Sequence, residues 1–115
     1  MRYWTLAEAR DYLPRLRELV TAIHDAVGMA TRSRTNGHGA ASSGIDPQEA
    51  LEELADGDIV LRDPERGLID FHARGTDGVV YLLCWQLGED ELGWWHLPEE
   101  GFAGRKPLPR NGGES

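Results

Sequence analysis

The chain has one cysteine among its 115 residues and no apolar segment near the roughly 20 residues needed to span a bilayer. A lone Cys84 cannot form an internal disulfide, which is typical of proteins from a reducing compartment. Residues 1–5 lead straight into a helical pattern without an apolar signal run. We therefore expect a soluble protein of the cytoplasm that has no membrane partner.

Basic residues are also scarce. The chain has 12 Lys and Arg residues against 20 Asp and Glu residues, which gives a net charge of −8. A protein of that sign repels phosphate backbones. The composition therefore disfavours nucleic acid as a partner.

Several short motifs that identify enzyme classes are missing. The sequence contains no GxxxxGK[ST], GxGxxG, HExxH, GxSxG or CxxC motif. Their absence excludes the classes that these motifs identify, not every enzyme. The sequence therefore favours a non-catalytic protein, and it assigns no cofactor.

A long N-terminal helix is the clearest element that is present. Thr5 and Glu8 have the spacing of a capping box, in which each side chain binds the backbone of the other residue. Apolar residues then recur at steps of three and four: Leu6, Ala9, Leu13, Leu16, Val20, Ile23 and Val27. Such a stripe packs along another helix. We expect a helix over residues 5–27, ended by Gly28. The part of its stripe that a second helix leaves uncovered packs either on the sheet or on a second subunit, in a homodimer formed through this helix.

The next segment is rich in Gly, Ser and Thr, so residues 28–45 are expected to be a flexible linker. A second helix is predicted for residues 46–57, because Asp46 is a good N-cap and Pro47 suits the first helical position. The linker lies inside one domain of residues 1–106. The last residues, 107–115, are expected to be a disordered tail.

From Asp58 onward, apolar and polar residues alternate with the period of a strand. The predicted strands cover residues 58–62, 67–73, 79–86 and 91–97. Connections this short favour an antiparallel meander. The expected fold is α+β, with the long N-terminal helix and the short second helix packed on one face of a four-stranded antiparallel meander sheet.

Loop lengths predict which residues share a face of this sheet. A four-residue loop after Ala73 places Asp70 opposite Tyr81, and a four-residue turn after Gln86 places Tyr81 opposite His96. The face under the helices then carries Ile69, Phe71, Val80, Leu82, Cys84, Trp95 and Leu97, with Cys84 as an inert buried thiol. The other face carries Asp70, His72, Tyr81, Trp85, Trp94 and His96.

That second face is the candidate ligand-binding site, together with Arg105 from the C-terminal segment. Its members are Asp70, His72, Tyr81, Trp85, Trp94, His96 and Arg105. Aromatic side chains supply contact area, and the polar groups supply directed hydrogen bonds. The alternative is a half-buried sheet face whose polar groups make structural hydrogen bonds. Arg105 either pairs with a carboxylate such as Asp70 or Asp63, or binds an anionic ligand.

Two functions follow from this interpretation. The first is a non-catalytic module that binds a small ligand or a protein partner. The alternative is a small metal-assisted enzyme in which Asp70, His72 and His96 bind the metal or act as acids and bases. For the alternative, these three side chains must converge on one cavity.

Four groups of residues resemble the pattern of a known family. They are Thr5-Leu6-x-Glu8-Ala9 with Leu13-Pro14; Asp63-Pro64 with Gly67-Leu68-Ile69-Asp70-Phe71; Leu83-Cys84-Trp85 with Leu87-Gly88-Glu89; and Trp95-His96 with Gly101-Phe102-Ala103-Gly104-Arg105. The chain resembles a bacterial and archaeal family of small proteins known only as domain of unknown function 2203. The resemblance covers nearly everything except residues 28–45 and the last few, and it implies no activity, substrate or cofactor. Where family members have a longer second helical region, this chain has a Gly/Ser-rich linker and a short helix.

Overall fold

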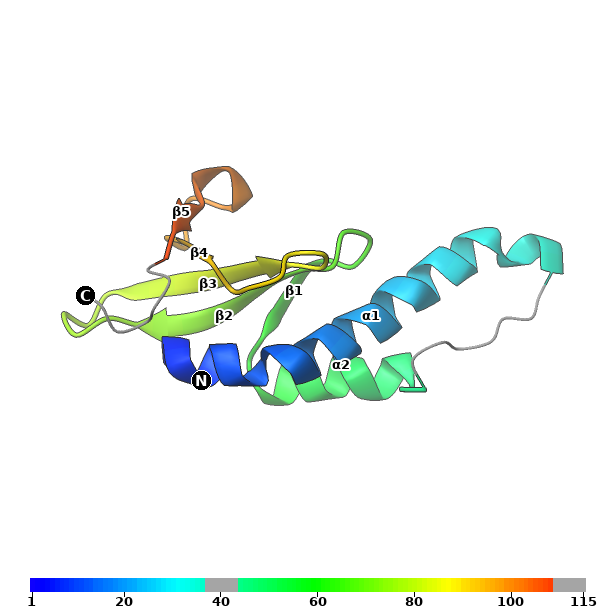
Figure 1. Ribbon diagram of the computed structural model, residues 1–115, viewed down its shortest axis with the longest axis horizontal. Helices are drawn as coiled ribbons and strands as arrows, with labels where there is room; N and C mark the ends of the chain where they lie inside the picture. The colour runs from blue at the N-terminus through cyan, green and yellow to red at the C-terminus, as the bar shows by residue number, and fades with distance from the viewer. Residues whose placement is uncertain (37–43, 109–115) are drawn as a thin grey trace.

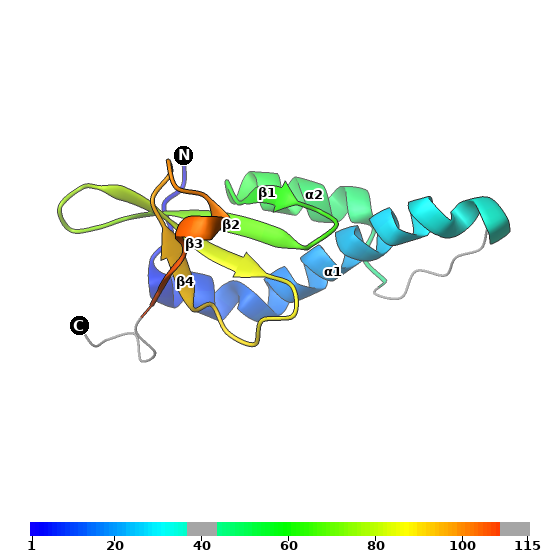
Figure 2. The same ribbon diagram turned by 90° about the horizontal axis from the view of Figure 1, so that it is seen from above.

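The computed structural model describes residues 1–36 and 44–108, and the side chains of residues 1–29 and 44–108. Two helices lie on one face of an antiparallel sheet, which confirms the predicted α+β class (Figures 1 and 2). The sheet has five strands instead of the predicted four, in the order β1-β2-β3-β4-β5. Among the described residues, no helix is both long enough and apolar enough to cross a membrane.

Helix α1 (Leu6–Asn36) begins as its sequence predicts. The backbone N–H of Glu8 donates to Thr5 Oγ1 at 3.0 Å, and the N–H of Thr5 donates to Glu8 Oε1 at 3.0 Å, so the capping box is formed. The predicted end at Gly28 is wrong, because the helix continues through this residue to Asn36. A single glycine costs a helix only about 1 kcal/mol relative to alanine, which the surrounding turns can offset.

Helix α2 (Pro47–Asp56) lies beside α1 and confirms the second predicted helix. Asp46 caps it by accepting the N–H of Gln48 at 3.2 Å. The two helices are joined by Glu53, which accepts hydrogen bonds from Tyr12 and Arg15 of α1. Burial raises the pKa of Tyr12, and the bond to Glu53 adds to that shift.

The limits predicted for the linker and the tail need correction. Residues 28–36 of the predicted linker are helical, while residues 37–43 lie outside the described part. At the other end, the domain does not stop at residue 106. Strand β5 (Lys106–Pro107) includes Pro107, and the N–H of Leu108 donates to Gly93 O at 2.8 Å. Residues 109–115 of the predicted tail also lie outside the described part.

The other strands are β1 (Val60–Asp63), β2 (Leu68–Arg74), β3 (Val80–Gln86) and β4 (Trp94–His96). A short 3₁₀ helix, η1 (Phe102–Gly104), precedes β5. In both ribbon views η1 lies over the face of the sheet that the helices leave uncovered (Figures 1 and 2). The sheet is therefore covered on one face by helices and in part on the other by the C-terminal segment.

The core lies between α1, α2 and the sheet. The apolar stripe of α1 is used inside the chain: Ala9, Leu13, Leu16, Val20 and Ile23 are all buried. From the sheet, Ile69, Phe71, Ala73, Leu83 and Trp85 complete the core. The residues that suggested helix-to-helix association thus pack against the chain's own sheet and α2. A homodimer through residues 5–27 stays a prediction.

The predicted register is wrong on both sides of β3. Asp70 lies opposite Cys84 and not Tyr81, and His96 lies opposite Leu82 and not Tyr81. The β2–β3 loop holds five residues, because Arg74 pairs with Val80. A slip of an odd number of residues turns every side chain of a strand to the other face. The faces predicted for β3 are therefore exchanged, whereas those of β2 and β4 hold.

Candidate ligand site on the open face of the sheet

The open face is the side of β2, β3 and β4 that points away from the helices. Its members alternate with the core residues and are Leu68, Asp70, His72, Leu82, Cys84, Trp94 and His96. Asp70 and His96 are buried there, with 1% and 2% of their surfaces exposed. They are the two buried polar or charged residues of the described chain. Buried ionisable groups are costly unless they are paired, so their partners define the site.

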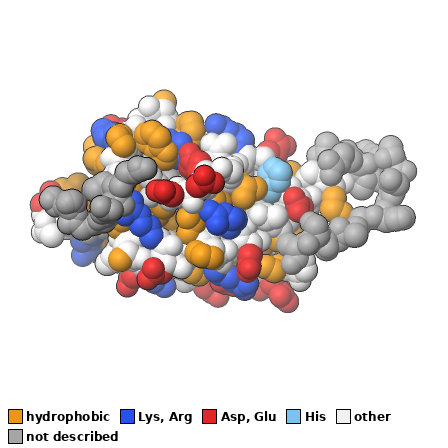
Figure 3. Space-filling model, in the orientation of Figure 1, with side chains coloured by type: hydrophobic (Ala, Val, Ile, Leu, Met, Phe, Trp, Pro, Cys, Tyr) orange, Lys and Arg blue, Asp and Glu red, His pale blue; other side chains and the backbone are white. Residues whose placement is uncertain are grey.

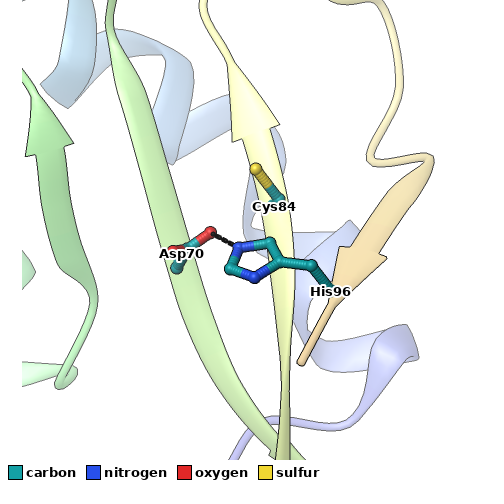
Figure 4. A group of neighbouring side chains, drawn as sticks. All are labelled: Asp70, Cys84 and His96. Atoms are coloured by element: carbon teal, nitrogen blue, oxygen red, sulfur yellow. Dashed lines mark hydrogen bonds and ion pairs between the residues drawn. The ribbon is translucent and has the colours of Figure 1, made fainter. Parts of the chain in front are cut away.

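Asp70 and His96 are partners of each other. The Nε2 atom of His96 lies 3.1 Å from Oδ1 of Asp70. Figure 4 shows the imidazole of β4 lying across β3 to reach the carboxylate of β2. The β3 residue opposite Asp70 is Cys84, whose small side chain lies beside the imidazole. A large side chain at position 84 would separate the pair.

Both ring nitrogens of His96 face oxygen acceptors. Nδ1 lies 2.8 Å from the backbone oxygen of Leu97, and Nε2 faces the carboxylate of Asp70. Each contact is satisfied when the nitrogen carries a proton. Both nitrogens are thus engaged with oxygen atoms, and neither has Cys84 as its hydrogen-bond partner. The three residues are therefore not arranged as a Cys–His–Asp nucleophilic triad.

Arg62 binds the second oxygen of the carboxylate. Its Nε donates to Asp70 Oδ2 at 2.7 Å, while 45% of its side chain stays exposed. Arg62 lies at an irregularity in the β1–β2 pairing, because Leu61 pairs with Ile69 and Asp63 already pairs with Leu68. The extra residue of such a bulge can turn its side chain toward a site. The bulge thus positions a guanidinium beside a buried carboxylate.

Cys84 is the third neighbour of Asp70. Burial raises the pKa of its thiol to about 12, and the charge of Asp70 and a hydrogen bond to it act in the same direction. Arg105 acts in the opposite direction. At neutral pH Cys84 is therefore a protonated thiol, as expected for a buried cysteine, although it lies on the open face and not under the helices.

The segment after β4 forms a wall of the site. Glu100 holds this segment in place, because it accepts hydrogen bonds from the N–H of Leu97 at 3.0 Å and from Nζ of Lys106 at 2.7 Å. These bonds lower the pKa of Glu100, the one to Lys106 contributing most. A cavity of about 240 Å³ remains between this segment and the sheet. It is lined by Arg62, Leu68, Asp70, Cys84, His96, Pro98, Gly101 and Phe102.

Two further arginines lie beside Phe102. The guanidinium of Arg66 lies 4.9 Å from the centre of the Phe102 ring, and that of Arg105 lies 4.5 Å from it. Arg105 also lies 4.9 Å from the ring of Trp94 and binds both carboxylate oxygens of Glu89 at 2.7 and 2.8 Å. Arg105 thus pairs with a carboxylate, as one of its two predicted roles required, but the partner is Glu89 and not Asp70 or Asp63. The buried Nε of Arg105 has no hydrogen-bond partner in the described chain.

The structure brings together part of the predicted site. Asp70 and His96 form its centre, and Trp94 lies opposite Cys84 and in contact with Arg105. His72 is on the same face, but its Nδ1 lies 3.1 Å from the backbone oxygen of Asp58, so it faces away from the cluster. The predicted metal set of Asp70, His72 and His96 is therefore not assembled.

Tyr81 and Trp85 are on the opposite face from the one predicted. Trp85 is fully buried in the core, where its Nε1 donates to Glu89 O at 3.2 Å. Tyr81 packs edge-on against Trp95, with 5.8 Å between the ring centres. Both face the helices because the register of β3 differs from the predicted one.

Arg62, Cys84 and Phe102 were missed as site residues. Cys84 was assigned to the wrong face by the register, and Phe102 entered only as part of the family pattern. For Arg62, an available signal was its place beside the Asp63-Pro64 turn, where strands commonly contain bulges. No local pattern shows that the bulge directs Arg62 toward Asp70.

Fold and site together define an α+β domain with a small cavity on the open face of its sheet. The chain belongs to the DUF2203 family, described as an uncharacterized conserved protein, whose model matches residues 2–108. This confirms the resemblance seen in the sequence. Comparisons with curated proteins and with solved structures found no match.

Proposed function

We propose that the protein is a binding module for a small organic anion, which enters the cavity beside Asp70 and His96. The observation that carries this proposal is the state of Arg62. This residue lines the cavity, and only its Nε donates a hydrogen bond to Asp70. Its two Nη nitrogens bind nothing in the described part of the chain. A guanidinium with free N–H groups at a cavity is suited to a carboxylate or a phosphate.

The charges around the cavity support an anion. Arg62 and Arg66 bring two positive charges beside the cavity, against the single carboxylate of Asp70. Arg66 lies nearby on the ring of Phe102, and no described carboxylate pairs with it. A positive site within a chain of net charge −8 attracts anions locally while the rest of the surface repels them. The face shown in Figure 3 has acidic and basic side chains mixed, without a continuous basic surface.

The size and depth of the cavity favour a small ligand over a protein partner. Its volume of about 240 Å³ equals that of about eight water molecules at roughly 30 Å³ each. The charged groups of its floor, Asp70 and His96, are buried, so a flat protein surface would not reach them. Leu68, Pro98 and Phe102 offer apolar contacts to the body of a ligand whose anionic end is at Arg62.

The test uses inorganic phosphate, acetate and benzoate as probes, with binding followed by amide chemical shifts of the ¹⁵N-labelled, metal-free protein. We expect one or more probes to bind at millimolar concentration and to shift the amides of Arg62, Cys84, His96 and Phe102. Arg62→Gln should weaken that binding at least tenfold. Arg74→Gln is the matched control, since Arg74 contacts Tyr3 away from the cavity, and it should bind as the wild type does.

Two results would contradict the proposal. One is the absence of saturable shifts around the cavity with all three probes. The other is equal weakening by the two arginine variants, which would indicate attraction by overall charge and not by the site.

A further inference from the structure

The cluster in the floor of the cavity combines three kinds of metal ligand. Asp70 offers a carboxylate oxygen, Cys84 a sulfur and His96 an imidazole nitrogen, and these atoms all lie within 4.8 Å of one another. They come from three adjacent strands, β2, β3 and β4, and point to the same side of the sheet (Figure 4). No other group in the described residues meets this criterion.

We propose that Asp70, Cys84 and His96 bind a transition-metal ion, with zinc as the ion that fits this ligand set best. Zinc is bound by sulfur, nitrogen and oxygen ligands in tetrahedral sites. Nitrogen and oxygen ligands about 2.0–2.1 Å from such an ion lie roughly 3.3 Å apart. The observed 3.1 Å between His96 Nε2 and Asp70 Oδ1 is close to that spacing. The sulfur of Cys84 lies within 4.8 Å of both other ligand atoms.

The orientation of His96 is that of a metal ligand. Its Nδ1 lies 2.8 Å from the backbone oxygen of Leu97, so a proton on Nδ1 is held by that bond. A zinc-binding histidine typically donates its other N–H to a carbonyl or a carboxylate, which fixes the ring. With Nδ1 so occupied, Nε2 is the atom that faces Asp70, and a metal ion would take the place of the proton between them.

Arg62 orients Asp70 as the backbone oxygen of Leu97 orients His96, through a hydrogen bond from outside the ligand set. It holds Oδ2 at 2.7 Å and leaves Oδ1 directed at His96. The carboxylate is therefore oriented before any ion binds. Outer partners of this kind typically change metal affinity 10- to 100-fold when they are removed.

The fourth ligand would come from the cavity. All three ligand residues line it, together with Arg62 and Phe102. Three protein ligands with a free side toward a cavity are typical of zinc sites that accept water or a small molecule. A carboxylate and a thiolate neutralise a divalent ion, so an anion held by Arg62 could complete the coordination. This last step rests on the proposed function, whereas metal binding itself does not.

The experiment adds Co²⁺ and, separately, Zn²⁺ to the full chain after chelator treatment. We expect one ion per chain by native mass spectrometry. With Co²⁺ we expect visible bands of tetrahedral cobalt and a near-ultraviolet thiolate-to-cobalt band. Cys84→Ser should lose the thiolate band, and His96→Gln should lose tight binding. His72→Gln, a histidine variant on the same face but outside the cluster, should behave as the wild type.

A second variant guards against loss of folding. Arg62→Gln keeps all three ligands, and it should weaken Zn²⁺ binding about 10- to 100-fold. The proposal is overturned if the folded wild type binds no ion, if the cobalt spectrum has no thiolate band, or if Cys84→Ser leaves that band unchanged. The phosphate and carboxylate titrations use metal-free protein, so failure of the metal site and failure of anion binding are seen separately.

Discussion

The two faces of the sheet bury their side chains by different means. On the helix-covered face, buried residues such as Phe71, Leu83 and Trp85 are apolar and pack against α1 and α2. On the open face, Asp70 and His96 are equally buried but are held by ion pairs and hydrogen bonds. Apolar burial stabilises a fold whatever the protein does. Buried charge with a cavity beside it carries information about function.

The largest loss of stability is expected from a substitution on the helix-covered face. Trp85 is fully buried, so Trp85→Ala should lower the free energy of unfolding by about 3–5 kcal/mol. Urea denaturation followed by circular dichroism measures this change. Trp94 lies half-buried on the open face, so Trp94→Ala should lower the free energy of unfolding by less than about 2 kcal/mol. Equal losses at the two positions would contradict the division of roles between the faces.

The next largest loss of stability is expected from a substitution of the buried carboxylate on the open face. Asp70→Asn removes the charge that Arg62 and His96 share, and it should lower the free energy of unfolding by about 2–3 kcal/mol. Asp90→Asn is an exposed control that should stay within about 0.5 kcal/mol of the wild type. If Asp70→Asn is instead more stable than the wild type, the buried carboxylate serves binding at a cost in stability.

Two glycines in the turns of the sheet, Gly67 and Gly78, are expected to differ in how much an alanine substitution costs. Gly67 has φ 68°, and a Cβ there would lie 2.5 Å from Leu87 Cβ and 3.1 Å from Val20 Cγ1. Gly67→Ala should therefore lower the free energy of unfolding by about 2 kcal/mol. Gly78 has φ 83° with open space around it, so Gly78→Ala should cost only about 1 kcal/mol. Thermal denaturation of the two variants gives the difference, and an equal cost would exclude the contact with Leu87 as its cause.

The smallest expected effect concerns the surface ion pair between the helices. Hydrogen bonds from Arg15 and then Tyr12 lower the pKa of Glu53 in the folded chain below the roughly 4.3 of an unfolded one. Glu53 therefore stabilises the fold above about pH 4.3, and that contribution is lost as the pH falls through its lowered pKa.

At pH 7, Glu53→Gln should be less stable than the wild type by about 0.5–1 kcal/mol, because the pair is partly exposed and screened. The difference should disappear near pH 2. Urea denaturation at the two pH values tests this. A difference that persists at low pH would mean that Glu53 acts through packing, unlike the charges of the open face.

Much of the helical part could be predicted from the sequence, because helix starts depend on local residues. The capping box of Thr5 and the N-cap Asp46 both form as expected. The end of α1 could not be located, since a single glycine costs a helix only about 1 kcal/mol relative to alanine and is therefore a weak stop. Strand β5 was missed because it is two residues long and contains Pro107, which strands normally avoid.

The site was predicted only in part, because some of its features depend on local residue pattern and others on loop lengths. Asp70 and His96 were chosen by residue type and alternation, and they do meet. Their neighbours depend on loop lengths, and a five-residue loop before Val80 turned Cys84 to the open face and Trp85 to the core. Such a loop differs from a four-residue loop by little free energy, so the sequence alone does not select one. The role of Arg62 depends on a bulge, which also lies beyond local pattern.

The adjacent residues Cys84 and Trp85 have a consequence for how errors in assembly are handled. If β3 paired one residue out of step, the indole would leave the core and the thiol would enter it. In one direction the same slip would put Trp85 opposite Asp70, and in the other direction it would put Leu83 there. A misaligned molecule would thus lose its stability and its cavity together. The correct register of β3 is therefore required both for a stable core and for the cavity. A chain whose cavity can bind a ligand is also one whose sheet has paired correctly.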